Sequence, residues 1–342
     1  VSFGRHGVMT PDEARKQARE LLVSVQQGEN PAEDIRIHRS APTVASLCER
    51  FMTEHVAHRC KPSTAGEYRR SVDMFITPEI GTYKVVDVTR ADIARLHHKL
   101  RHIPYQANRT LGVLSKLFNL AEVWGLRPDG SNPCRHVKKY AEEKRERYLS
   151  ADELAALGSA LDAAEADGSE SVHFIAAIRL LILTGCRLGE IQTLKWSHVR
   201  DTHLALPDSK TGAKKVYIGP AAVDVLNAIP RLPDNSYVIC GTVPGQHLTD
   251  MQKPWRRLRK RAGLPDLRIH DLRHSFASAA VGMGESLPMI GKLLGHTQVQ
   301  TTARYAHLAD DPVQASSIRI SNLLADRIKG KAVEPSPDVS DL

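Results

Sequence analysis

Residues 270–305 read HDLRHSFASAAVGMGESLPMIGKLLGHTQVQTTARY, and this stretch carries the most informative pattern in the chain. His270 and Arg273 stand three positions apart near the start of an expected helix, so both side chains lie on one face and can bind one anion. A further helical segment ends before His296, and Tyr305 follows nine residues later. A lone tyrosine is more often a core residue than a nucleophile, so the rest of the chain decides its role.

A metal site is the alternative for this stretch, because His270 and His274 are four residues apart on one helix face. The pattern departs from the zinc-binding His-Glu-x-x-His motif. Asp271 stands where the catalytic Glu belongs, and Arg273 would place a positive charge beside the cation. The sequence also has no Gly-x-x-x-x-Gly-Lys-Ser/Thr loop for nucleotide phosphates. It therefore favours an anion at this site, and neither a metal nor a cofactor is expected.

Charge is unevenly distributed along the 342 residues, which carry 47 Lys and Arg against 39 Asp and Glu. Residues 41–147 hold 19 basic and 12 acidic residues, whereas residues 148–342 are nearly balanced, with 22 and 21. A basic domain gains affinity for a polyanion by releasing counterions. The middle of the chain therefore favours nucleic acid as a partner over a merely solvated basic face.

The five cysteines are widely spaced and form no Cys-x-x-Cys pair. This argues against a disulfide framework or a zinc ribbon and indicates a reducing cytosol. No apolar run approaches the roughly 20 residues that span a bilayer, and the start lacks a secretory signal pattern. Because the sequence opens on Val1, we expect a fragment of a longer chain.

Capping signals and composition divide the chain into segments. A helix is expected from Pro11 to about Gln27, and Asn30-Pro31 begins a linker. Four further helices are expected to start near Thr43, at a capping box on Thr64, at Thr89 and at Asn108. We expect an N-terminal domain remnant at residues 1–40, an all-helical domain at 41–137 and a polar linker at 138–147. A mixed domain at 148–329 and a disordered tail at 330–342 follow.

The mixed domain is expected to be mainly helical with a small antiparallel sheet. Val172–Thr184 reads as a buried helix. His203–Leu206 and Lys215–Ile218 read as two strands of a hairpin, and Asn235–Cys240 as a candidate third strand. Basic residues on the helical domain and on a helix from Pro254 are candidate DNA contacts: Arg69, Arg70, Arg95, Lys99, Arg109, Lys116, Arg256 and Arg257.

Two upstream residues complete the pattern of the opening stretch. Arg187 lies in a tight turn after the helix ending at Gly185, where a guanidinium can be preorganised for phosphate oxygens. Lys210 lies at the hairpin tip, from which a loop can carry it into a groove. In order and spacing, the set resembles the tyrosine recombinases of the phage integrase family over about residues 41–320: Arg187, Lys210, His270, Arg273, Gly295, His296 and Tyr305.

The resemblance implies an architecture and a reaction. In that family an all-helical core-binding domain and a mixed catalytic domain form a C-shaped clamp around DNA, and residues 1–37 resemble the end of the arm-binding domain of prophage and genomic-island integrases. Tyr305 would attack a DNA phosphodiester and form a 3′-phosphotyrosine link, which conserves the bond energy, so that rejoining needs neither ATP nor metal. Arg187 and Arg273 would stabilise the charge of the transition state.

The remaining roles follow from the same resemblance. His296 would donate a hydrogen bond to the phosphate, and His270 would take or relay the proton of the tyrosine. Lys210 is the candidate acid for the leaving 5′-oxygen, with Lys214 and Lys215 left open as alternatives. Glu190 is expected to orient the site as a buried partner.

The resemblance also implies partners and leaves alternatives. The expected partner is double-stranded DNA at an attachment site of a mobile element, with a monomer when free, a homotetramer on synapsed DNA, and accessory bending or directionality proteins. The expected location is the bacterial cytoplasm, at the nucleoid. The helix Val313–Ile328 would dock on a neighbouring subunit or on its own domain. A type IB topoisomerase and a non-catalytic DNA-binding protein remain alternatives; strand exchange and a Tyr305 adduct separate them.

Overall fold

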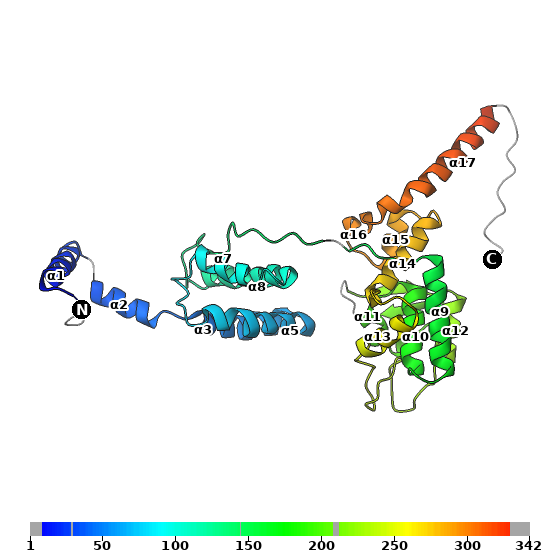
Figure 1. Cartoon of the computed structure of the whole chain (residues 1–342), viewed down its shortest axis with the longest axis horizontal. Coiled ribbons are helices and arrows are strands. Elements are labelled where there is room, and N and C mark those ends of the chain that lie inside the picture. The colour runs from blue at the N-terminus through cyan, green and yellow to red at the C-terminus, as the bar shows by residue number, and fades with distance from the viewer. Residues whose placement is uncertain (1–8, 29, 144, 208–211, 329–342) are drawn as a thin grey trace. The chain divides into compact units, whose positions relative to one another are not determined.

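The computed structural model describes residues 9–28, 30–143, 145–207 and 212–328 (Figure 1). The chain divides into two compact units, residues 1–144 and 145–342, and each is described by itself. No helix of the described part is long and apolar enough to cross a membrane.

The first unit is helical throughout its regular structure. It contains α1 to α8, with two π-helical turns joining neighbouring helices: α1 Pro11–Gln26, α2 Pro31–Ser40, α3 Val44–Arg50, η1 Phe51–Val56, α4 Ala57–Arg59, α5 Pro62–Ser71, η2 Val72–Ile76, α6 Thr77–Ile80, α7 Arg90–Lys99 and α8 Pro104–Val123. The apolar stripe of α8 lies at the centre of the core, where Leu114, Leu117 and Phe118 are fully buried. Helices α3, α5 and α7 pack against α8.

Three expectations for this unit are wrong. The helix expected to start at Asn108 is α8, which begins at Pro104, so Asn108 lies inside its second turn. The linker expected from Asn30-Pro31 is the helix α2, because the Asn30 side chain caps it by accepting from Glu33 N and Pro31 suits its first turn. The capping box expected at Thr64 is not used. Helix α5 begins at Pro62 instead, so Thr64 lies inside the first turn. The caps at Thr43 and Thr89 form as expected.

The second unit combines helices with one hairpin. Its elements run from α9 to α17: α9 Ala151–Ala166, α10 Val172–Thr184, α11 Leu188–Gln192, η3 Trp196–His198, β1 His203–Leu206, β2 Lys214–Tyr217, α12 Pro220–Ala228, α13 Gln252–Arg261, α14 Ile269–Gly282, α15 Leu287–Leu294, α16 Val299–Ala303, η4 Ala306–Ala309 and α17 Asp310–Ile328. The apolar helix α10 is the centre of the core and contacts α9, α11, α12 and α14.

The sheet of the described residues has two strands, β1 and β2, paired antiparallel with Leu204 opposite Val216. The third strand expected at Asn235–Cys240 does not form. This segment makes single bridges to different partners, Lys195 with Tyr237 and Cys240 with His247, so no continuous ladder develops.

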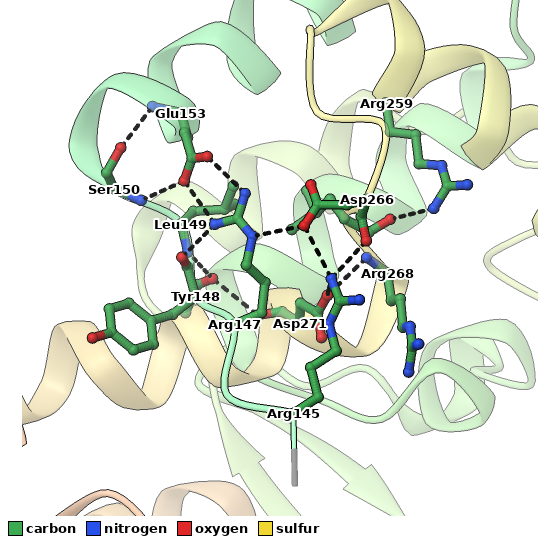
Figure 2. Close-up of polar contacts among 12 residues, drawn as sticks. Arg145, Arg147, Tyr148, Leu149, Ser150, Glu153, Arg259, Asp266, Arg268 and Asp271 are labelled. Carbon is green, nitrogen blue, oxygen red and sulfur yellow. Dashed lines mark hydrogen bonds and ion pairs between the residues drawn. The ribbon is translucent and has the colours of Figure 1, made fainter. Parts of the chain in front are cut away.

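Most of the segment expected as a linker contacts one unit or the other. In the first unit, Asn108 of α8 accepts from Tyr140 N and donates to Tyr140 O, both at 2.9 Å. The Tyr140 ring stacks on His97 with 4.4 Å between ring centroids. In the second unit, Arg145 and Arg147 bind carboxylates of that unit (Figure 2). Tyr140 therefore belongs to the first unit by its contacts, and Arg145 and Arg147 belong to the second.

Candidate active site

The turn between α10 and α11 positions Arg187. Helix α10 ends at Gly185, whose φ of +61° is left-handed, and a Cβ there would lie 2.6 Å from the Phe276 ring. The Glu190 carboxylate then accepts from the Arg187 backbone N–H at 2.8 Å and from its guanidinium at 3.0 Å. Local backbone geometry and one buried carboxylate therefore hold this arginine.

Arg273 is a buried cation on α14, with 4% of its surface exposed. Its Nη1 donates to Gly185 O at 2.6 Å and its Nη2 to Leu294 O at 2.7 Å. The side chain therefore links the end of α10 to the end of α15. Burial and the neighbouring charge of Arg187 lower the pKa of Arg273. The charges of the two guanidinium groups repel each other, and a bound anion relieves that repulsion.

Two histidines face the same cations. Burial lowers the pKa of His270, and the charges of Arg273 and Arg187 lower it further against the opposing effect of Asp271. Burial, with Arg273 and Arg187 again, lowers the pKa of His296 to about 4. The His296 ring is oriented by Thr302, whose Oγ1 lies 2.8 Å from Nδ1. Both rings therefore adjoin the arginine pair.

Of the three lysines left open as the acid, two lie within the described residues. Lys210 lies outside them. Lys214 is 10% exposed, and its Nζ is 2.8 Å from the Glu190 carboxylate. Its side chain passes over Gly295, where a Cβ would lie 2.9 Å from Lys214 Cδ. Lys215, the next residue of β2, is exposed, because successive strand residues face opposite sides.

Tyr305 lies after α16 and is 5% exposed, in a small cluster with Ala277, Ile290 and Leu294. Its hydroxyl is 2.6 Å from Nδ1 of His274. Burial raises the pKa of Tyr305, which Arg304 and Arg273 oppose.

His274 is the site residue that sequence reasoning missed. The sequence pattern indicates it only as half of a metal pair with His270. The signal that points to it is its position one turn after His270, on the face that carries the phosphate-binding candidates.

The first residues of the second unit, 145–148, form one wall of a pocket beside Tyr305. The residues that line the pocket come from this segment, from α14 and from the region after α16: Arg145, Glu146, Arg147, Tyr148, His274, Arg304, Tyr305 and His307. Figure 2 shows how the segment is anchored. Arg147 binds Glu153 at 2.6 Å, and Arg145 donates to Asp266 O at 2.6 Å.

The anchor reaches the helix that carries His270 and Arg273. Asp271 caps the start of α14 by accepting from Arg268 N at 2.8 Å, and the same carboxylate oxygen lies 3.4 Å from Arg145 Nη2. Arg145 also pairs with Asp266 at 3.2 Å. The first residues of the second unit are thus tied to the start of α14.

The candidate DNA contacts of the sequence do not share one environment. Five of them pair with carboxylates of their own unit in this structure: Arg69, Arg95, Lys99, Arg109 and Arg257. The side chains of Arg70, Lys116 and Arg256 are exposed. Across the described ranges, no group of three or more His, Cys, Asp and Glu is arranged to hold a metal ion.

In the second unit the charges of Arg187 and Arg273 act on His270 and His296, and Arg273 also acts on Tyr305. Residues 147–311 match the model of the phage integrase family, and residues 43–101 match the N-terminal SAM-like domain of phage integrases. The chain belongs to the phage integrase family, the tyrosine recombinases.

Among relatives, the integrase of Escherichia phage P2 is 31% identical over 219 residues, which are 62% of this chain and 58% of that protein. The shufflon-specific DNA recombinase of Escherichia coli is 29% identical over 247 residues, 70% of this chain and 59% of that protein. The matched regions therefore span less than two thirds of these relatives.

Solved structures share the fold. A lambda integrase dimer bound to a COC′ core site aligns with a TM-score of 0.66 and 22% identity, covering 86% of both chains. A lambda integrase tetramer bound to a Holliday junction aligns with a TM-score of 0.64 and 20% identity, covering 87% of this chain and 90% of that one. The expected fold class, mainly helical with a small antiparallel sheet in the mixed domain, is confirmed.

Proposed function

We propose that this protein is a site-specific DNA recombinase that cleaves and rejoins strands through a covalent 3′-phosphotyrosine intermediate. The observation that carries the proposal is the cationic pair Arg187 and Arg273, whose charges act on each other and on both His270 and His296. Such a cluster is stable when an anion lies between its members. A phosphodiester is the anion that family membership supplies.

The geometry supports a role for each group. In-line attack by the Tyr305 oxygen places extra negative charge on the non-bridging oxygens of the phosphorus. The two arginines and His296 stabilise this charge, a task that a metal ion performs in many other phosphoryl-transfer enzymes. Because Arg273 is fixed by Gly185 and Leu294, its guanidinium needs no reorganisation during the reaction.

Lys210 remains our candidate for the acid that protonates the leaving 5′-oxygen, by resemblance to the family. Lys214 has a different environment, since its ion pair with the buried Glu190 commits it to the charge network behind Arg187. A lysine that neutralises a buried carboxylate is a poor proton donor, because losing its proton would leave that carboxylate unpaired.

The proposed partners are double-stranded DNA at an attachment site of a mobile element and further copies of this chain. Lambda integrase has been solved as a dimer on a core site and as a tetramer on a Holliday junction. On α17, large apolar side chains are exposed: Ile318, Ile320, Leu323, Leu324 and Ile328. We propose that they bind a neighbouring subunit on DNA, with action at the bacterial nucleoid and accessory DNA-bending or directionality proteins as further partners.

A suicide substrate tests the reaction. A duplex carrying the attachment site, nicked next to the cleavage position, loses a short fragment after cleavage and traps the covalent complex. We expect a protein–DNA adduct with the unaltered protein and none with Tyr305→Phe, which lacks the nucleophilic oxygen. DNA binding by Tyr305→Phe should remain unchanged in a mobility-shift assay. An adduct that persists in Tyr305→Phe would contradict the proposal, and so would its absence from the unaltered protein.

A further inference from the structure

The hydroxyl of Tyr305 has one defined partner in the described part of the chain. His274 Nδ1 lies 2.6 Å away, a short distance for a hydrogen bond between two uncharged groups. Both groups belong to the buried side of the site, since the Tyr305 side chain is 5% exposed and His274 lies on α14. The contact joins the nucleophile to the helix that carries Arg273.

The charges around His274 determine whether its ring is neutral or protonated. Four groups that are cationic or can become so lower the pKa of His274 by their charge: His270, Arg304, Arg273 and His296. Glu146 and Tyr305 line the same pocket as His274. Burial lowers the pKa of His274 to about 4, and these groups act in the same direction. The ring is therefore neutral at pH 7. A neutral ring with its proton on Nε2 has a free lone pair on Nδ1, and we assign this tautomer because it lets the phenol donate to His274.

The other candidate base is His270, whose ring contacts that of His274. His270 stands edge-on to His274, with 5.0 Å between ring centroids, and it adjoins the arginine pair. Arg304 lies over the Tyr305 ring, with its Cζ 5.9 Å from the centroid, and stabilises negative charge on the phenol oxygen. The tyrosine thus has a proton acceptor on one side and a cation over its face.

Resting on the proposed function, we infer that His274 takes the proton of Tyr305 during strand cleavage, with His270 placed to relay it. The Tyr305 oxygen forms a bond to phosphorus, the bond from phosphorus to the 5′-oxygen breaks, and the phenolic proton moves to His274 Nδ1. The 5′-oxygen takes its proton from a separate acid, proposed above to be Lys210. On rejoining, the 5′-hydroxyl attacks phosphorus and returns its proton to that acid, the bond from phosphorus to the Tyr305 oxygen breaks, and the departing phenolate recovers its proton from His274.

The surroundings of His274 make its basicity depend on whether DNA is bound. Without DNA, the neighbouring cations and burial keep His274 a weak base, and the proton stays on the phenol. A bound phosphodiester places negative charge among Arg187, Arg273 and His296, so it offsets the cations that disfavour protonated His274. The basicity of His274 therefore rises when a phosphate is in place, and Tyr305 remains protonated in its absence.

Two substitutions separate proton transfer from a structural role. His274→Asn keeps an oxygen acceptor near the position of Nδ1 but is no base at neutral pH, whereas His274→Ala removes both properties. We expect both variants to form adduct on the suicide substrate at least about 100-fold more slowly at pH 7, as for loss of a general base. Their rates should rise about tenfold per pH unit from 7 to 9, because phenolate must then form without help.

Chemical rescue provides a second measurement. The pocket beside Tyr305 includes His274 in its lining, so added imidazole can reach the space that His274→Ala vacates. We expect imidazole to raise the rate of adduct formation by His274→Ala at least tenfold, and ring-substituted imidazoles to rank by their basicity. Imidazole should leave Tyr305→Phe inactive. DNA affinity and circular dichroism serve as checks on folding.

The outcomes distinguish this inference from the proposed function. Wild-type rates in His274→Asn, or in His274→Ala without imidazole, would overturn the inference while leaving the recombinase proposal intact. If His274→Asn is much faster than His274→Ala and imidazole does not rescue His274→Ala, then His274 only orients Tyr305. This outcome would also overturn the inference. Absence of any adduct from the unaltered protein would overturn the proposed function, and this inference with it.

Discussion

The buried guanidinium of Arg273 shows how one residue serves both fold and site. Its two hydrogen bonds to the carbonyls of Gly185 and Leu294 align the ends of α10 and α15. A lysine keeps the charge, but its compact ammonium cannot bridge two carbonyls and a phosphate in the same plane. The planar fork, more than the charge, is therefore the property this position requires.

Substitution of Arg273 by lysine tests whether the planar fork is required. Arg273→Lys should lower the rate of adduct formation roughly 100- to 1,000-fold, the range for losing one preorganised donor to a transition state. Single-turnover cleavage of the suicide substrate measures it. The matched control is Arg259→Lys, since Arg259 also donates to a carbonyl, Leu267 O at 2.8 Å, but belongs to α13. A comparable rate loss in both variants would show that the effect is not specific to the site.

Glu190 couples the site to pH. Burial alone would raise the pKa of Glu190, but hydrogen bonds from Lys214 and the Arg187 backbone outweigh it, and the net effect is a lowered pKa. The ionised carboxylate therefore stabilises the fold above its unfolded value near 4.3, and this stability is lost as pH falls through the lower folded value.

Glu190→Gln should accordingly lower the free energy of unfolding by about 3 kcal/mol at pH 7, as for breaking a buried pair. The difference from the unaltered protein should shrink between pH 5 and pH 3. Chemical denaturation across this range measures it. Glu165→Gln is the control, because Glu165 pairs with Arg179 at 2.7 Å on the surface, where the expected loss is below about 1 kcal/mol. A pH-independent difference for Glu190→Gln would contradict the assignment.

At the scale of the element, the ends of helices decide where the reactive groups lie. Helix α10 ends at Gly185 and α15 ends at Gly295, both with left-handed backbone, and the next residues turn toward the site. At Gly185 the absence of a side chain also lets the Phe276 ring approach closely. These glycines are required because other residues are strained in this conformation.

Gly185→Ala should lower the free energy of unfolding by about 2–4 kcal/mol, from backbone strain together with overpacking against Phe276. Gly168→Ala is a matched control: Gly168 has φ +66°, and a Cβ there meets nothing within 4 Å. It should lose only the strain, about 1 kcal/mol. Urea unfolding followed by circular dichroism compares the two. Equal losses would mean that the contact with Phe276 contributes nothing.

For the whole molecule, the exposed apolar side of α17 is the feature that a single unit does not explain. Leu323 and Leu324 are 37% and 51% exposed within the second unit. Exposed leucines contribute little to the stability of that unit, but burying them between subunits stabilises an assembly. The proposed assembly on DNA therefore predicts separate effects on folding and on association.

The double substitution Leu323→Glu with Leu324→Glu should leave the melting temperature within about 2 °C, because exposed positions usually change stability by less than about 0.5 kcal/mol. It should reduce tetramer formation on synapsed DNA by at least about tenfold, since the interface would bury two charges. Size-exclusion chromatography with light scattering measures the assembly. Asn322→Glu, an exposed neighbour, should assemble normally. Normal assembly by the double variant would remove α17 from the interface.

Local sequence signals predicted much of this architecture. The caps at Thr43 and Thr89, the buried helix Val172–Thr184 and the first strand of the hairpin were all predicted correctly. Each depends on interactions within a few residues of the chain or on one strong apolar run. The third strand was predicted wrongly, because pairing depends on partners distant in sequence, and here those partners are separate segments.

The amino-acid sequence by itself determined the family, the fold class and the set of phosphate-binding candidates, because the order and spacing of the reactive residues can be read directly from the sequence. Only the tertiary structure decided which groups meet. It placed His274 against the Tyr305 hydroxyl, Lys214 against Glu190, and the segment around Arg145 and Arg147 against the start of α14. These contacts join parts of the chain far apart in sequence, and they form only when α10, α14 and α15 pack around their common core.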